Sequence, residues 1–464
     1  VRAGRIKLYK EMKAQELWRK MVTMLFETGH PWMTFKDPCN IRSPQDHAGT
    51  IHSSNLCTEI TLNTSKDEIA VCNLGSLNLS RHVGADGVLD RELLAKTTKL
   101  GMRMLDNIID LNFYPVPETQ NSNLKHRPVG LGIMGLQDVF YKMDLDFDSE
   151  SAVKLSDEIM ELVSYHAILS SSELAKERGS YSSYEGSKWS RDIFPIDTID
   201  ILEEERGMKT FVDKSSKMDW TPVRAHVKQY GMRNSNCMAI APTASISNFA
   251  GCFPSIEPPY SNLYVKSNMF GEFTIANEYL VSDLKKLNLW GNEMLSLLKR
   301  FDGDISAISQ IPIHVREKYK GVFSISPHWV IRHAAYRGKW IDQSQSVNIF
   351  TSTTKGSELQ GIYIDAWKSG LKTTYYLRTL GASGIEKSSV EIETSQAALV
   401  SVDRLPQAEV HIEATAQVFA AAQQNLPMPM LESTPTDLVE QMAGSQYKVG
   451  QTCRMDDPTC ESCQ

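Results

Sequence analysis

Cys57 lies between two side chains that could assist chemistry at its sulfur, in the segment Asn55–Glu59. If this segment is extended, Asn55, Cys57 and Glu59 alternate and their side chains point to the same side. A carboxylate beside a reactive sulfur could then act as a general base. A small buried cysteine flanked by turn residues would explain the same pattern, and the five residues leave both interpretations open.

Two further features could carry electrons to or from such a thiol. Cys72 follows fifteen residues after Cys57, and Tyr375 and Tyr376 form an adjacent pair of phenols. Adjacent phenols can pass an electron and a proton along, although neighbouring tyrosines in a strand more often face the core and the solvent respectively. A thiol, a base, a phenol pair and a dithiol together are what one-electron chemistry on a sugar requires.

The dithiol is Cys460 with Cys463, a C-x-x-C pair near the end of the chain. Such pairs exchange readily with other disulfides because their thiols are accessible and the loop between them is short. Half of a zinc site is the alternative, but zinc prefers four ligands. Cys453 is the one other candidate nearby, and no histidine follows His411. The sequence therefore favours a redox-active pair without a metal.

A loop of small and hydroxyl-bearing residues follows a candidate buried strand at 237–241. Its backbone N–H groups and hydroxyls could hold a phosphate if a helix comes next; without a helix it is a capped loop. The candidate phosphate-binding residues are Pro242, Thr243, Ala244, Ser245 and Ile246, followed by Ser247.

The segment Gly130–Gly135 satisfies the G-x-G-x-x-G pattern of dinucleotide-binding proteins. That pattern should follow a strand within a βαβ unit. Here Val129 alone separates it from Pro128, which leaves no room for a strand of useful length. We expect these glycines to allow close backbone packing, and a nicotinamide dehydrogenase remains an alternative that depends on them alone.

Composition excludes several classes of protein. The chain has 464 residues, 41% of them hydrophobic and 23% charged, as in ordinary globular proteins. A net charge of −7 gives no electrostatic argument for binding nucleic acid or a membrane surface. The sequence shows neither an apolar run of the roughly 20 residues that a membrane span needs nor a signal peptide. Eight cysteines in this length are too sparse for a secreted disulfide scaffold, so we expect a cytoplasmic protein.

Short strands alternating with long helices predict an α/β fold with parallel pairing. Helices are expected at 1–30, 90–112, 150–178, 275–301, 312–320, 356–369 and 410–424, and strands at 69–72, 237–241 and 372–378. From about residue 426 prolines accumulate and apolar residues become sparse, which is typical of a flexible tail. We therefore expect a catalytic region at 1–425 and a redox-active tail at 426–464.

Together these segments resemble the large, catalytic subunit of class I ribonucleoside-diphosphate reductase. The resemblance rests on 55–59, 72–78, 127–135, 231–235, 242–247, 256–259, the tyrosine pair and the terminal C-x-x-C. It implies the C-terminal part of a ten-stranded α/β barrel with a central finger loop, followed by the tail.

The resemblance also implies roles for the site residues. Cys57 would become a thiyl radical that abstracts the 3′-hydrogen of the ribose, while Glu59 takes the 3′-hydroxyl proton and Asn55 orients the substrate. Cys72 would be one of two cysteines that supply two electrons as the 2′-hydroxyl leaves as water. The loop at 242–247 would bind the substrate phosphates.

Partners follow from the same resemblance. Tyr375 and Tyr376 match the relay that brings the radical from a small subunit, which holds the metal centre, so this chain would bind no cofactor directly. Cys460 and Cys463 match the tail dithiol that re-reduces the active site and is itself reduced by thioredoxin or glutaredoxin. The full-length subunit would form a homodimer.

One departure from the family pattern concerns the partner of Cys72, which should lie well before Cys57. The one earlier cysteine is Cys39, in the unmatched context Asp37–Asn40. We therefore expect a C-terminal portion of the catalytic subunit that lacks turnover alone. An adenosylcobalamin-dependent reductase and a non-catalytic fragment that binds the small subunit remain alternatives.

Overall fold

The computed structural model describes residues 9–268 and 271–380. The α-helices are α1 (Ala14–Thr28), α2 (Lys36–Ile41), α3 (Arg91–Leu111), α4 (Pro117–His126), α5 (Leu136–Lys142), α6 (Glu150–Arg178), α7 (Thr198–Arg206), α8 (Thr221–Tyr230), α9 (Ile246–Ala250), α10 (Glu278–Lys286), α11 (Asn292–Arg300), α12 (Ile313–Lys318), α13 (Pro327–Gly338) and α14 (Gly356–Lys368). The strands are β1 (Leu74–Asn78), β2 (Gly130–Met134), β3 (Leu263–Asn268), β4 (Gly271–Ala276), β5 (Ile349–Thr351) and β6 (Leu377–Thr379). The expected helix at 410–424 and the tail with Cys453, Cys460 and Cys463 lie outside the described residues.

Five extended segments lie side by side in parallel and form the framework of the described region. β1 pairs with β2, and Leu131 of β2 pairs with Met238. Ile240 then pairs with Gln345, whose segment continues into β5, and β5 pairs with β6. One or more helices connect each segment to the next, as parallel pairing requires. Five parallel strands are half of the ten that the resemblance implies.

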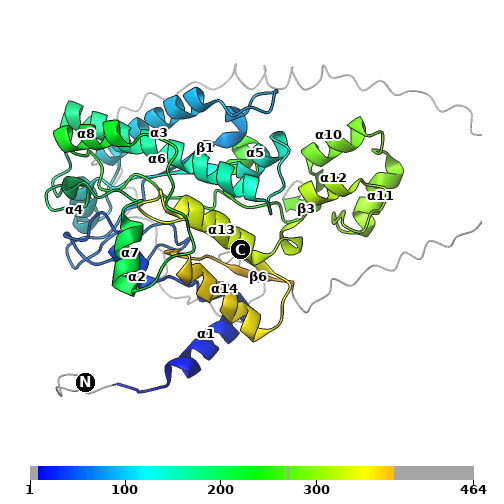
Figure 1. Ribbon diagram of the computed structural model, residues 1–464, viewed down its shortest axis with the longest axis horizontal. Helices are drawn as coiled ribbons and strands as arrows, with labels where there is room; N and C mark the ends of the chain where they lie inside the picture. Colours follow the sequence, from blue (N-terminus) through cyan, green and yellow to red (C-terminus); the bar gives the residue numbers. More distant parts are fainter. Residues whose placement is uncertain (1–8, 269–270, 381–464) are drawn as a thin grey trace, which may run out of the picture. The chain divides into compact units, whose positions relative to one another are not determined.

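Long helices cover this framework. α3 packs against α6, and α6 also packs against α8 and α13 (Figure 1). The Ser149 hydroxyl caps the start of α6 by accepting from the Ala152 N–H, and Gly179 ends the helix as expected. The predicted helices at 90–112, 150–178 and 356–369 are confirmed as α3, α6 and α14.

The segment from Leu263 to Lys318 departs from the parallel pattern. β3 and β4 form an antiparallel hairpin, and α10, α11 and α12 follow with a hydrophobic core of their own. The single helix expected at 275–301 is wrong. Asn277 caps α10 by accepting from the Tyr279 N–H, and the chain turns between α10 and α11, where Asn288 has φ of 55°.

Three other boundaries differ from expectation. The strand expected at 372–378 is regular only from Leu377, where β6 begins, and Thr373 makes an isolated antiparallel bridge with Thr34. The N-terminal helix begins at Ala14, since Tyr9–Lys13 are not helical and residues 1–8 lie outside the described part. The strand expected at 69–72 is absent there; strand pairing starts at Leu74 instead. The β-branched residues of this run precede the strand because the backbone at Ile69 donates to the carbonyl of Glu118 and not to a neighbouring strand.

The glycines of 130–135 serve close packing, as predicted. Gly130 and Gly132 belong to β2, which lies between β1 and the segment at 238–240. A Cβ on Gly132 would lie 2.4 Å from the carbonyl oxygen of Ala239, and one on Gly130 would lie 2.6 Å from Leu74 Cδ2. The contact at Gly132 is with backbone, so a side chain there would push the neighbouring segment away; at Gly130 the Leu74 side chain could move, but Ala239 Cβ would still lie 2.9 Å away.

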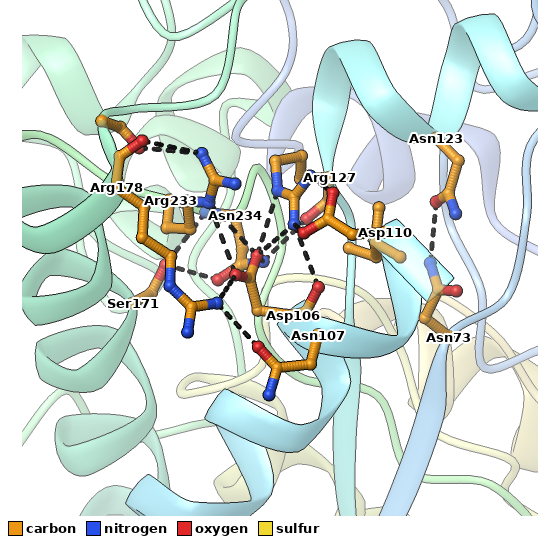
Figure 2. Close-up of polar contacts among 12 residues, drawn as sticks. Asn73, Asp106, Asn107, Asp110, Asn123, Arg127, Ser171, Arg178, Arg233 and Asn234 are labelled. Atoms are coloured by element: carbon orange, nitrogen blue, oxygen red, sulfur yellow. Dashed lines mark hydrogen bonds and ion pairs between the residues drawn. The ribbon is translucent and has the colours of Figure 1, made fainter. Parts of the chain in front are cut away.

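A buried carboxylate joins two of the segments on which the resemblance rests. Asp106 of α3 is fully buried and accepts from Arg127 Nε at 3.0 Å and from Arg178 Nη1 at 3.0 Å, while Arg233 Nε lies 3.4 Å away (Figure 2). Asn234 Nδ2 also donates to Asp106. Arg127 precedes β2, and Arg233 precedes the next parallel segment. Asp106 therefore fixes where both strands enter the framework.

Replacement of Asp106 by alanine should lower the free energy of unfolding by about 3–5 kcal/mol, because buried guanidinium groups lose their counter-charge. Asp110 also pairs with Arg127, but its side chain is 49% exposed, so Asp110→Ala should cost no more than about 1 kcal/mol. Urea unfolding followed by circular dichroism would measure both variants. Equal losses would show that the buried network contributes nothing beyond a surface pair.

Within the described residues, no helix combines the length and the apolar character needed to cross a membrane.

Candidate active site

Cys57 lies in a tight turn and not in an extended segment. The Thr58 N–H donates to the Asn55 carbonyl at 3.2 Å, and Thr58 has φ of 69°. Positive φ is unfavourable for a β-branched residue and persists where surrounding contacts impose it. The buried Thr58 hydroxyl donates to the Thr374 carbonyl at 3.2 Å, which is one such contact. The expectation of an extended segment is therefore wrong.

The turn nevertheless brings Asn55 and Glu59 together. Asn55 Nδ2 donates to Glu59 Oε2 at 2.9 Å, and Asn55 Oδ1 accepts from the Ile60 N–H at 3.1 Å. Glu59 is only 2% exposed, so its carboxylate is held in one direction by these contacts. The amide and the carboxylate thus form one unit beside the Cys57 thiol.

The neighbouring strand holds this turn in place. The Ser344 N–H donates to the Glu59 carbonyl at 2.9 Å, and Ser346 Oγ lies 2.6 Å from the Cys57 carbonyl oxygen and 3.2 Å from Glu59 Oε2. A hydroxyl carries one proton, so Ser346 donates to one of these acceptors at a time. The sequence assigned no role to this polar stretch, Gln343–Ser346. The burial of its serines and glutamines is known only from the fold.

The Cys57 thiol lies next to the phenol of Tyr375. Tyr375 Oη lies 3.6 Å from Cys57 Sγ. Burial raises the pKa of Cys57, the hydrogen bond with Tyr375 lowers it, and the Glu59 carboxylate raises it, with a net rise. Burial likewise raises the pKa of Tyr375. Both groups therefore keep their protons at neutral pH, which suits loss of a hydrogen atom better than attack by a thiolate.

Tyr375 and Tyr376 lie ring to ring, with centroids 4.4 Å apart. Trp32 contacts both, at 5.2 Å from Tyr375 and 5.3 Å from Tyr376, and His30 lies 5.3 Å from Tyr376. An antiparallel pairing of Thr34 with Thr373 brings this aromatic segment alongside the tyrosines. Sequence reasoning missed Trp32 and His30, because nothing in the chain order links residue 32 with residue 375.

Cys72 directly precedes Asn73, whose Nδ2 donates to Asn123 Oδ1 at 2.7 Å and to the Pro128 carbonyl at 2.8 Å (Figure 2). Desolvation, followed by the Glu59 carboxylate and the Cys57 thiol, raises the pKa of Cys72 to about 11. The Cys72 side chain is itself exposed. Cys39 is buried in α2, where its thiol donates to the Lys372 carbonyl at 3.4 Å.

A short helix does follow the loop of hydroxyl-bearing residues, because α9 begins at Ile246 and includes the last two residues of 242–247; it has five residues. Within the described part of the chain, the N–H groups of Ala244, Ser245 and Ile246 donate no hydrogen bond. The loop starts two residues after Ile240, which exchanges backbone hydrogen bonds with Ser344 and Ser346. It thus leaves the carboxyl end of a parallel segment, where α/β folds bind ligands, next to the strand that contacts Cys57.

Comparison with known proteins places this arrangement in a family. A family model described as "Ribonucleotide reductase, barrel domain" matches residues 2–377. The chain belongs to the ribonucleotide reductase family. The match confirms the expected barrel architecture and agrees with the parallel framework.

Relatives of the ribonucleotide reductase family are similar over most of this chain. The "Ribonucleoside-diphosphate reductase subunit alpha" of Chlamydia pneumoniae is 55% identical over 84% of the chain and 38% of its own length. The "Ribonucleoside-diphosphate reductase large subunit" of Trypanosoma brucei brucei is 41% identical over 86% of the chain and 48% of its own length. The chain thus spans less than half of either relative.

A solved structure agrees. The "Actinobacillus ureae class Id ribonucleotide reductase alpha subunit" is 28% identical, with a TM-score of 0.61, over 79% of this chain and 61% of that one. Both the named relatives and this structure are alpha or large subunits, as the resemblance implied.

Proposed function

We propose that this chain carries the catalytic centre for radical-based reduction of ribonucleoside diphosphates to 2′-deoxyribonucleoside diphosphates. The observation that carries the proposal is the contact of Tyr375 Oη with Cys57 Sγ at 3.6 Å, beside the Asn55–Glu59 pair. A phenol next to a protonated thiol can exchange a hydrogen atom with it. A carboxylate within the same turn can take a proton from the substrate.

In the proposed reaction, the Cys57 thiyl radical takes the 3′-hydrogen of the ribose and Glu59 takes the 3′-hydroxyl proton. The 2′-hydroxyl then takes a proton and leaves as water, and two thiols supply two electrons and two protons, one for the water and one for the 2′-carbon, as they become a disulfide. Cys72 is proposed as one of these thiols. The hydrogen atom returns from Cys57 to the 3′-carbon, which restores the thiyl radical. Asn55 orients the substrate by holding Glu59, and 242–246 supply N–H groups for the diphosphate.

Electrons and the radical would come from partners. We propose that a small subunit with a metal centre delivers the radical through Tyr376 and Tyr375, and that thioredoxin or glutaredoxin reduces the Cys460–Cys463 pair. The full-length subunit is proposed to form a homodimer. The phenol relay favours this assignment over an adenosylcobalamin-dependent reductase, which would not need a tyrosine beside Cys57. The division between the catalytic region and the tail at residue 425 belongs to the same proposal.

The assay for this function uses a catalytic subunit of the relatives' length that contains this chain. It is mixed with the small subunit, a dithiol reductant and a ribonucleoside diphosphate, and deoxyribonucleoside diphosphate is quantified. We expect turnover that requires the small subunit. Turnover that requires adenosylcobalamin instead, or no turnover together with small-subunit binding, would contradict the proposal.

The tail dithiol has its own test. Cys460→Ser combined with Cys463→Ser should block repeated turnover with thioredoxin but leave a single turnover from pre-reduced enzyme, because the active-site thiols still hold two electrons. Product per active site, measured after rapid mixing, should stay near one. Normal cycling of this double variant with thioredoxin would refute the shuttle role.

A further inference from the structure

The backbone at the tyrosine pair is irregular. The Tyr375 N–H donates to the Val347 carbonyl at 2.7 Å, and the Tyr376 carbonyl accepts from the Ile349 N–H at 2.8 Å. Between these bonds, the Tyr376 N–H donates to the side-chain Oδ1 of Asn348 at 3.2 Å. Two consecutive N–H groups thus point at the same neighbouring strand, whereas successive residues of a regular strand alternate.

This irregularity explains the position of the two rings. In a regular strand, successive side chains point to opposite faces of the sheet. The rings of Tyr375 and Tyr376 instead lie with centroids 4.4 Å apart. A local bulge of this kind re-aims a side chain, and bulges are common beside active sites. The ring contact on which the relay depends is therefore a product of the bulge.

Glu257 sets the orientation of Asn348. Its Oε1 accepts from the Asn348 N–H at 3.0 Å, and its Oε2 accepts from Asn348 Nδ2 at 3.1 Å. Burial raises the pKa of Glu257, whereas the two hydrogen bonds from Asn348 and the charges of Arg378 and Arg337 lower it, so these contacts favour the ionised form. An ionised carboxylate only accepts hydrogen bonds. It therefore holds the Nδ2 side of the amide toward itself, which leaves Oδ1 to face the Tyr376 N–H.

A positively charged side chain also lies beside Tyr376 and Glu257. The Arg378 guanidinium lies 4.7 Å from the centre of the Tyr376 ring, and both Arg378 and Arg337 are close enough to act on the charge of Glu257. Glu257 belongs to the segment 256–259, to which no role was assigned from the sequence. The carboxylate, the amide and the ring thus form one connected unit that reaches from this segment to the relay.

We infer that Glu257 and Asn348 are positioning residues that hold the backbone of Tyr376 in its bulge, so that its ring contacts Tyr375 and the radical can pass between them. The inference rests on the proposed function, because the positions of these residues matter for catalysis only if the tyrosine pair carries the radical. Neither side chain touches a reacting atom. Their effect is on the distance and orientation between two phenols.

The test uses Asn348→Ala and Glu257→Gln in a full-length catalytic subunit assembled with its small subunit. Alanine removes the acceptor for the Tyr376 N–H. Glutamine offers an N–H₂ where Asn348 Nδ2 donates, which favours a flipped Asn348 amide that presents Nδ2 to Tyr376. We expect kcat to fall by about 10–100-fold, as for a misplacement of roughly 1 Å, while KM for the diphosphate stays within about 2-fold.

Radical position provides a readout that a general loss of stability would not produce. With the more easily oxidised 3-aminotyrosine at position 375, electron paramagnetic resonance should show slower radical formation in both variants. The same probe at position 376 should still form its radical, because that step precedes the affected contact. Hydrogen exchange of a peptide covering 374–377 should be faster in Asn348→Ala. Unchanged kcat and unchanged exchange would overturn the inference.

Asn348→Asp offers a conservative rescue. One aspartate oxygen can still accept from the Tyr376 N–H, but the other faces Glu257, so the two carboxyls must share a proton. The charged groups that face this pair are Arg337 and Arg378. Activity of Asn348→Asp should therefore recover toward the wild-type value as the pH falls from 8 to about 6, whereas Asn348→Ala should show no such recovery. Identical pH profiles for the two variants would overturn the inference.

Two controls separate the possible failures. Asn262 is a buried asparagine whose side chain likewise holds backbone groups, since it donates to the carbonyls of Gly303 and Tyr319 in the α10–α12 region. Asn262→Ala should leave the kcat of folded enzyme unchanged. If Tyr375→Phe and Tyr376→Phe both turn over normally, the relay itself is wrong. If they are inactive while Asn348→Ala and Glu257→Gln behave as wild type, only the positioning role is wrong.

Discussion

Replacement of Cys57 by serine in a full-length catalytic subunit is expected to reduce turnover by at least about 10⁴-fold, or roughly 5.5 kcal/mol at about 1.4 kcal/mol per tenfold change. Serine is similar in size to cysteine and also carries one hydrogen on its terminal atom. Its O–H bond, however, is much harder to break homolytically than the S–H bond of cysteine. The hydrogen atom would then stay on the serine when Tyr375 is oxidised. Deoxyribonucleoside diphosphate formation and substrate-radical signals measure the effect.

Cys39→Ser is the matched control for this substitution. Cys39 is buried and its thiol donates to the Lys372 carbonyl, a bond that a serine hydroxyl can also make. Its activity should remain within about 2-fold of wild type, because Cys39 is outside the proposed chemistry. A Cys57→Ser enzyme that still forms product, or a substrate radical in its presence, would remove the basis of the proposed function.

Tyr375→Phe is expected to have the second-largest effect, a loss of turnover of about 10³-fold or more. Phenylalanine keeps the ring that packs against Tyr376 and Trp32, so the fold and the substrate site should persist. It removes the hydroxyl that lies 3.6 Å from Cys57 Sγ, and with it the group that would accept the hydrogen atom of the thiol. Turnover and binding of the diphosphate should therefore separate: the first is lost and the second is retained.

Tyr114→Phe is a suitable control for the loss of a phenol hydroxyl. Tyr114 Oη donates to the Ile109 carbonyl at 2.6 Å and accepts from Asn123 Nδ2 at 2.7 Å, and neither partner belongs to the proposed relay. This variant should keep turnover per folded enzyme. Equal activity of Tyr375→Phe and Tyr114→Phe would show that the radical reaches Cys57 by another route.

The architecture followed from the sequence where periodicity was strong. α3, α6 and α14 begin and end near the predicted residues, because their apolar positions recur with helical spacing and because Asp90, Ser149 and Gly179 supply caps or breaks. Predicted boundaries were wrong where backbone groups form hydrogen bonds with a segment other than the neighbouring strand. The run at 69–72 has strand-like residues, but its N–H at Ile69 is taken by Glu118, and the chain joins the sheet only at Leu74.

The site divides in the same way. Residue types together with the family resemblance made Cys57, Glu59, Asn55, Cys72 and the tyrosine pair candidates, because a thiol, a carboxylate and adjacent phenols have few other uses together. No feature of the sequence pointed to the roles of Ser346, Trp32, Asn348 and Glu257. Their types are ordinary, and their significance comes from contacts between separate segments of the chain: Ser346 with Cys57, Trp32 with Tyr375, and Asn348 with both Glu257 and Tyr376.

Amino-acid order thus established the class of fold, the motifs and the chemistry available to this chain, since these depend on local periodicity and on the reactivity of individual side chains. The backbone conformation and the distances at the site residues were decided only by the tertiary structure. The turn at Cys57 and the bulge at Tyr376 contradict the extended backbone that local propensity suggests. Both exist because partners remote in sequence, Thr374 for the turn and Asn348 for the bulge, hold backbone groups that a regular strand would pair differently.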